Sequence, residues 1–114
     1  MESIKMMKKT YTLAALLLSA VAGFAHADEA AQMKRGKELF LTAAVPACAV
    51  CHALKDAGAE GAIGPVLDEL QPDAARVARA LKDGIGAMPS FKATMSEADI
   101  AAVSLYVSKV SRAK

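Results

Sequence analysis

The sequence predicts a small all-α protein. Of its 114 residues 26 are alanine, a strong helix former. Apolar residues recur at helical spacing in three segments, and no segment shows the alternation of apolar and polar residues that is typical of a half-buried strand. A chain of this length is sufficient for one small domain. We therefore expect a single domain of three to five helices.

The first 27 residues resemble a secretory signal peptide. Three lysines lie in the opening segment, a run of 13 apolar or small residues covers positions 12–24, and Ala25-His26-Ala27 forms an A-x-A cleavage site. The run is shorter than the roughly 20 residues that cross a bilayer. We predict cleavage after Ala27, with an uncleaved membrane anchor as the alternative. The mature protein would then be residues 28–114, without a membrane span, and its location the periplasm.

The first helix is expected over residues 28–41. Two acidic residues at its start favour the positive end of the helix dipole. Met33, Gly36, Leu39 and Phe40 form one apolar stripe. Gly36 lowers helix stability by about 1 kcal/mol relative to alanine. Its presence indicates either the close approach of a second helix or a helix that tolerates the glycine.

Residues 48–54 are expected to form one or two helical turns, and residues 55–64, with three glycines, a loop. The next helix opens at Gln71-Pro72-Asp73, because proline suits a first turn, and ends at Gly84. On one side of it lie Ala74, Val77, Ala78, Leu81 and Ile85, whereas Arg76, Arg79 and Lys82 point elsewhere.

The last helix is expected over residues 96–110. Ser96 and Asp99 approximate a capping box, with Met95 and Ile100 as a hydrophobic staple around it. Its inward face consists of Ile100, Val103, Tyr106, Val107 and Val110.

Between the first two long helices lies Cys48-Ala49-Val50-Cys51-His52, a C-x-x-C-H motif. Such a motif attaches a c-type haem: two thiols about one helical turn apart reach the two vinyl groups, and the histidine coordinates the iron. A redox-active dithiol would be expected near a βαβ pattern, which is absent. A structural zinc site usually requires four Cys or His ligands, and the mature chain supplies three. We therefore predict one covalent haem c, with zinc or dithiol chemistry as the alternatives.

The second axial position decides what such a haem does. The mature chain has no second histidine and three methionines. Met33 and Met95 occupy helix-stripe and staple positions, so both are expected in the core. Met88 lies in a glycine-rich segment before Pro89, and we predict it as the second ligand, with Met95 as the alternative. With both axial positions occupied, the centre transfers electrons. Without Met88, an open haem that senses gases or reacts with peroxide is the alternative.

Charge argues against nucleic-acid binding. The net charge of +2 comes from residues 1–27, because three of the 14 basic and one of the 12 acidic residues lie there. The mature chain is therefore neutral and has no basic stripe.

Taken together, these residues resemble a class I cytochrome c. The resemblance covers nearly the whole mature chain, and its motifs are Gly36 to Phe40, Cys48 to His52, Gly64-Pro65-x-Leu67, Gly86-x-Met88-Pro89 and Tyr106. It implies a compact α-helical fold around the haem, with thioethers at Cys48 and Cys51. It also implies His52 and Met88 as axial ligands, and a Pro65 carbonyl that accepts a hydrogen bond from the His52 ring.

A narrower resemblance involves residues 45–61 and 64–70, which are similar to the small cytochrome subunit of bacterial sulfite dehydrogenases. That family accepts electrons from a molybdenum-cofactor subunit that oxidises sulfite. The resemblance implies an electron carrier that is not itself an enzyme, with a molybdopterin subunit as donor and a downstream cytochrome or oxidase as acceptor. The alternative is a free-standing shuttle for another periplasmic dehydrogenase or a terminal oxidase.

Overall fold

The computed structural model describes residues 28–113. The signal peptide predicted for residues 1–27 lies outside this range. From Gln32 onward the chain forms one compact unit. No helix in the described part of the chain is both long and apolar enough to cross a membrane.

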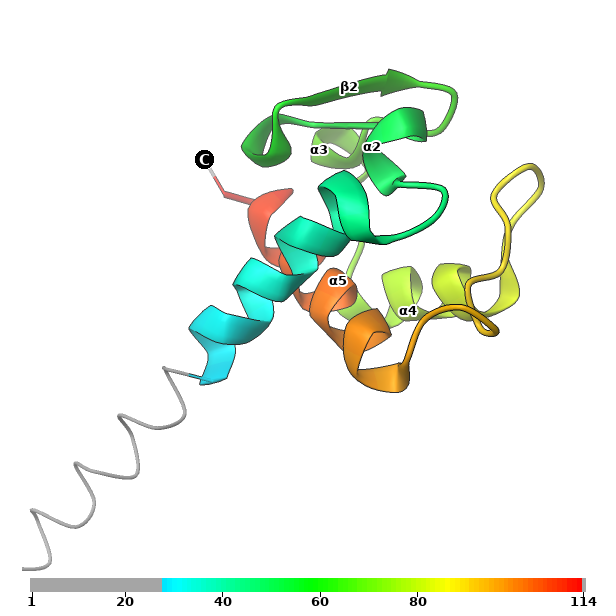
Figure 1. The fold of residues 1–114 in the computed structure, drawn as a ribbon. Coiled ribbons are helices and arrows are strands. Elements are labelled where there is room, and N and C mark those ends of the chain that lie inside the picture. Colours follow the sequence, from blue (N-terminus) through cyan, green and yellow to red (C-terminus); the bar gives the residue numbers. More distant parts are fainter. Residues whose placement is uncertain (1–27, 114) are drawn as a thin grey trace, which may run out of the picture. The chain divides into compact units, whose positions relative to one another are not determined.

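Helices dominate the unit, as predicted (Figure 1). In chain order the elements are a helix over residues 28–38 that continues as η1 (Leu39–Ala43), α2 (Cys48–Cys51), β1 (His52–Leu54), η2 (Lys55–Ala57), β2 (Ala59–Ala62), α3 (Leu67–Leu70), α4 (Ala74–Asp83) and α5 (Glu97–Val110).

A small antiparallel sheet is the main departure from the sequence prediction. β1 pairs with β2, with His52 opposite Ala62 and Leu54 opposite Ala59. The prediction of helix up to Leu54 and of loop after it was therefore wrong. The physical reason is that strands of three and four residues rich in alanine and glycine carry no alternating pattern, and their pairing depends on contacts beyond the segment itself.

The first helix and α5 approach closely at Gly36. A β-carbon added there would lie 2.3 Å from the Ala102 carbonyl oxygen and 2.6 Å from Tyr106 Cβ. One turn further on, the rings of Phe40 and Tyr106 meet edge to face, with centroids 6.1 Å apart. Of the two explanations for Gly36, the structure therefore confirms close helix packing.

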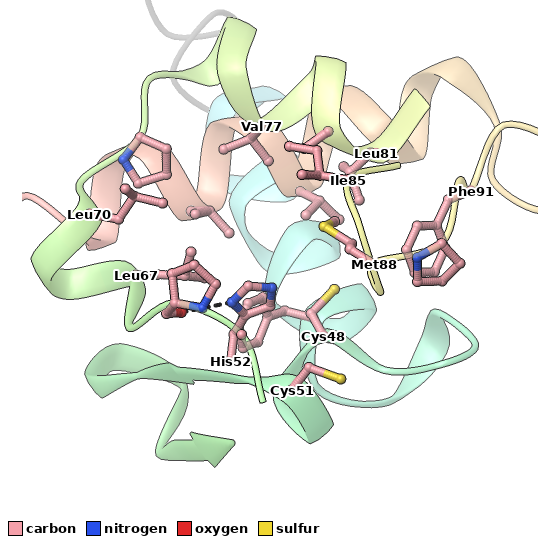
Figure 2. Close-up of a pocket in the computed structure, with 18 of the residues that line it drawn as sticks. Cys48, Cys51, His52, Leu67, Leu70, Val77, Leu81, Ile85, Met88 and Phe91 are labelled. Carbon is pink, nitrogen blue, oxygen red and sulfur yellow. Dashed lines mark hydrogen bonds between the residues drawn. The ribbon is translucent and has the colours of Figure 1, made fainter. Parts of the chain in front are cut away.

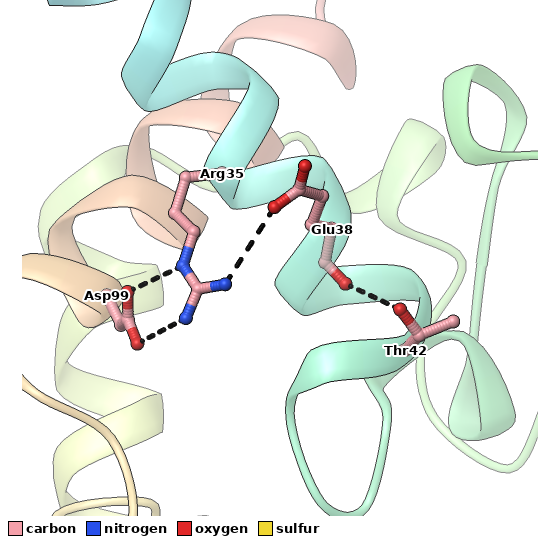
Figure 3. Close-up of polar contacts among 4 residues, drawn as sticks. All are labelled: Arg35, Glu38, Thr42 and Asp99. Atoms are coloured by element: carbon pink, nitrogen blue, oxygen red, sulfur yellow. Dashed lines mark hydrogen bonds and ion pairs between the residues drawn. The ribbon is translucent and has the colours of Figure 1, made fainter.

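An ion pair joins the same two helices at the start of α5 (Figure 3). Arg35 donates from Nε and Nη2 to the two carboxylate oxygens of Asp99, at 2.9 and 3.0 Å. Arg35 also lies 3.8 Å from Glu38, whose backbone carbonyl accepts a hydrogen bond from Thr42 Oγ1 at 3.3 Å. The bond from Arg35 holds the pKa of Asp99 below its usual value.

Local signals fix both ends of α4 and the start of α5. The Asp73 carboxylate accepts from the Arg76 backbone N–H at 2.7 Å, and Gly84 ends α4 with φ of 72°. Ser96 Oγ accepts from the Asp99 N–H at 3.1 Å, which confirms the predicted cap. The buried apolar cluster combines these elements: Leu39, Phe40, Leu54, Leu67, Leu81, Phe91, Met95, Ile100, Val103, Tyr106 and Val107.

Candidate functional site

A cavity of about 380 Å³ opens among α2, α3, α4, α5 and the segment that follows α4 (Figure 2). All five site residues predicted from the sequence line it, namely Cys48, Cys51, His52, Pro65 and Met88. Its remaining walls are mainly apolar and include Phe40, Leu67, Leu70, Val77, Leu81, Phe91, Val103 and Val107.

The α2 helix brings both cysteines to this cavity. It spans four residues, so that Cys48 and Cys51 lie about one turn apart. Burial raises the pKa of the Cys48 thiol to about 11. Reactive dithiols depend on a lowered thiol pKa, so this environment disfavours the dithiol alternative. Among the described residues, no three Cys, His, Asp or Glu side chains gather closely enough to hold a metal ion, which disfavours the zinc alternative.

His52 ends α2 and starts β1, with an extended backbone at φ −115° and ψ 136°. Its Nδ1 lies 2.8 Å from the Pro65 carbonyl oxygen. Because a carbonyl oxygen only accepts, Nδ1 carries the ring proton in this bond and Nε2 keeps a free lone pair. A histidine oriented in this way by a backbone carbonyl is typical of metal-ligating histidines.

Gly64 makes room for this ring. Its N–H donates to the Cys51 carbonyl at 2.7 Å, which ties the chain after β2 back to α2. A β-carbon at Gly64 would lie 2.5 Å from Cε1 of His52 and 2.8 Å from its Nδ1. A residue larger than glycine would therefore displace the imidazole from its hydrogen bond with the Pro65 carbonyl.

Met88 is held by a tight turn after α4. Ile85 and Met88 exchange backbone hydrogen bonds of 3.1 and 2.9 Å, and the Phe91 N–H closes the segment by donating to the Leu81 carbonyl at 2.7 Å. Figure 2 shows Met88 projecting into the cavity from this turn, while His52 projects from the junction of α2 and β1. The chain thus presents a thioether and an imidazole from two separate segments to the same space.

The other two methionines of the described chain lie elsewhere. Met95 is buried in the protein core, and Met33 packs against that core. Neither lines the cavity. Both positions agree with the core placement expected from their helix patterns.

The cavity residues fit a covalently held haem. Two thiols, one imidazole nitrogen and one thioether face a space with apolar walls. Cys, His and Met are the residue types that attach and ligate haem in cytochromes c. Apolar walls suit the faces of a macrocycle and exclude water from its iron.

Sequence reasoning did not assign the cavity walls to the site. Val77, Leu81, Val103 and Val107 were expected as inward helix faces, and they line the cavity as well as the core. Their only signal is apolar periodicity, which does not distinguish a face packed on protein from a face packed on a cofactor. Arg76, expected to point elsewhere, also lines the cavity.

The fold and this site together define a small c-type cytochrome. Residues 31–107 match the family model described as cytochrome c oxidase, cbb3-type, subunit III, and the chain belongs to this cytochrome c family. It is also similar to the crystal structure of the c-type cytochrome SorU from Sinorhizobium meliloti. The identity is 49%, the match covers 70% of this chain and 91% of that one, and the TM-score is 0.68. No curated protein matches the chain.

These findings confirm the predicted class. The protein is a monohaem c-type cytochrome with a small cytochrome c fold and one covalent haem c. It is an electron carrier rather than a catalytic enzyme.

Proposed function

We propose that this chain is a periplasmic cytochrome with His/Met-ligated iron that receives electrons from a molybdenum-cofactor subunit that oxidises sulfite. A downstream cytochrome or oxidase accepts the electrons. The observation that carries the proposal is the convergence of Cys48, Cys51, His52 and Met88 on one apolar cavity. Haem c held there supplies reversible one-electron transfer.

Each of these residues has its own task in the proposal. Cys48 and Cys51 would form the thioethers, and His52 would bind the iron through Nε2 while the Pro65 carbonyl orients the ring. Met88 would supply the second ligand to the iron. A thioether ligand raises the reduction potential, and the apolar walls keep small ligands and water away from the iron.

The axial assignment is testable with matched methionine variants. A ferric haem with a methionine ligand shows a weak sulfur-to-iron charge-transfer band in the far red. We expect this band to disappear in Met88→Ala and to persist in Met95→Ala, which serves as the control. The reverse pattern would assign Met95. Absence of the band in the wild type, together with ready carbon monoxide binding, would favour the open-site sensor.

The location is testable through the N-terminus of the exported protein. The basic opening segment, the apolar run and the A-x-A site support export with cleavage after Ala27. We expect mass spectrometry of the periplasmic fraction to find Asp28 as the first residue. A protein retained in the membrane with residues 1–27 attached would contradict this expectation.

The sulfite-oxidising partner rests on the resemblance of residues 45–61 and 64–70 to the small cytochrome subunit of bacterial sulfite dehydrogenases. We expect a molybdenum-containing subunit to co-purify with the cytochrome from periplasm. That subunit should reduce the cytochrome when sulfite is added. If the cytochrome elutes alone and accepts electrons from another dehydrogenase, the free-standing shuttle is correct.

The docking surface is expected to be apolar. Ile63 and Ile85 line the cavity and are 74% and 66% exposed, so they lie at its mouth. Val45, next to the cavity residue Pro46, is 80% exposed. Such a surface predicts docking with weak salt dependence. A steep fall in electron-transfer rate with ionic strength would contradict it.

A further inference from the structure

Arg76 is the only Lys or Arg among the described residues that line the cavity. Apart from His52 and the two cysteines, its neighbours in that lining are apolar side chains or glycine. Arg76 is itself exposed, which places it at the rim of the cavity rather than deep inside. A cation at the rim of an otherwise apolar cavity is suited to an anionic group on the edge of the occupant.

The guanidinium of Arg76 is available for such a group. Within residues 28–113 no carboxylate or carbonyl accepts a hydrogen bond from it. The Asp73 carboxylate is close by, but it accepts from the Arg76 backbone N–H, at 2.7 Å, and so caps α4. An arginine presents five N–H donors in a planar fork, a geometry that matches a carboxylate.

The position of Arg76 also matches the chemistry of a haem anchored at α2. Thioethers form at the vinyl edge of the ring, and the two propionate carboxylates lie at the opposite edge. In the sequence Arg76 comes shortly after the cavity residues Leu70 and Pro72 and directly before the cavity residue Val77. Figure 2 shows Leu70 at the end of the cavity that lies away from the Cys48 and Cys51 sulfurs.

We propose that Arg76 binds a haem propionate and thereby raises the reduction potential of the centre. This inference rests on the proposed haem site. The sign follows from electrostatics: an uncompensated carboxylate near the iron favours the oxidised, more positive state, and a guanidinium on that carboxylate removes the preference. Exposure at the rim weakens the effect through solvent screening without changing its sign.

The chain offers a matched control on the same helix. Arg79 lies three residues further along α4, is also exposed, and does not line the cavity. Arg76→Gln removes the positive charge, and Arg76→Lys keeps the charge but lacks the planar set of N–H donors of a guanidinium. Arg79→Gln removes an equal charge outside the cavity.

Two measurements on the purified holoproteins test the inference. These are the midpoint potential by spectroelectrochemistry and the propionate bending band in resonance Raman spectra, which reports hydrogen bonding to the propionate. We expect Arg76→Gln to lower the potential and shift the band. Arg76→Lys should shift the band but retain a potential closer to the wild type. Arg79→Gln should match the wild type in both measurements.

Two outcomes would overturn the role of Arg76. One is an unchanged potential and band in Arg76→Gln, and the other is an equal shift in Arg79→Gln, which would be a general effect of net charge. The far-red band and the pyridine haemochrome spectrum separate this failure from failure of the site. If the wild type lacks covalent haem, the proposed function fails. If covalent haem and the far-red band are intact while Arg76→Gln changes neither the potential nor the propionate band, only the role of Arg76 fails.

Discussion

Gly36→Ala tests whether the crossing of the first helix with α5 limits the stability of this cytochrome. In an isolated helix this substitution stabilises by about 1 kcal/mol, because alanine is the better helix former. In this structure the new β-carbon meets the Ala102 carbonyl oxygen at 2.3 Å and Tyr106 Cβ at 2.6 Å. Both distances are far below van der Waals contact, and neither neighbour is the end of a flexible side chain.

The magnitude follows from the balance of the two effects. Overpacking of a close contact costs about 1–3 kcal/mol, and the distances at Gly36 favour the upper end of that range. After the gain in helix propensity, a net destabilisation of about 2 kcal/mol remains. For a domain of this size that corresponds to a fall of roughly 10 °C in Tm.

The assay is urea and thermal unfolding of the holoprotein, followed by far-UV circular dichroism. Lys34→Ala is the control, because Lys34 is exposed on the same helix and its replacement is expected to change stability by less than about 0.5 kcal/mol. If the Gly36→Ala protein were as stable as the wild type, the close contact at Gly36 would not limit stability. The first helix and α5 could then move apart to admit the methyl group without loss of free energy of unfolding.

Three further predictions concern the hydrogen bonds around the site and the helix crossing. Tyr106 donates to the Asp56 carboxylate at 2.6 Å, so Tyr106→Phe should lower the free energy of unfolding by about 1.5 kcal/mol, and an unchanged urea midpoint would contradict this. The pKa of Asp99 is lower in the folded protein than in the unfolded chain, so the ionised carboxylate stabilises the fold. This stabilisation is fully present above the unfolded-state pKa of about 3.9 and is lost as the pH falls through the folded-state pKa. The difference in Tm between wild type and Asp99→Asn should therefore be constant above about pH 4 and shrink below it, whereas parallel curves would argue against the ion pair. Gly64→Ala places a β-carbon 2.5 Å from the His52 ring and should reduce haem incorporation, measured as haemochrome per protein; normal incorporation with an unaltered spectrum would speak against it.

The sequence alone determined the chemistry of attachment and the ends of the longer helices. Five consecutive residues, Cys48 to His52, carry the haem motif, because attachment requires residue types at fixed spacing rather than a particular surrounding fold. The Ser96 cap and the Gly84 stop act through their own backbone neighbours, and so they could be located without tertiary information. Met88 was singled out because it lies in a glycine-rich segment, and its role as ligand stays a prediction.

Only the tertiary structure decided which surfaces meet. The β1–β2 sheet forms between strands too short to have a pattern of their own, so it is visible only once the chain has folded back over α2. The closeness at Gly36 and the room that Gly64 leaves for His52 depend on residues distant in sequence. Arg76 was expected to point elsewhere, because periodicity orients a helix only relative to its own apolar stripe. The packing of the whole chain decides what the other residues of α4 face. For Arg76 that is the rim of the cavity.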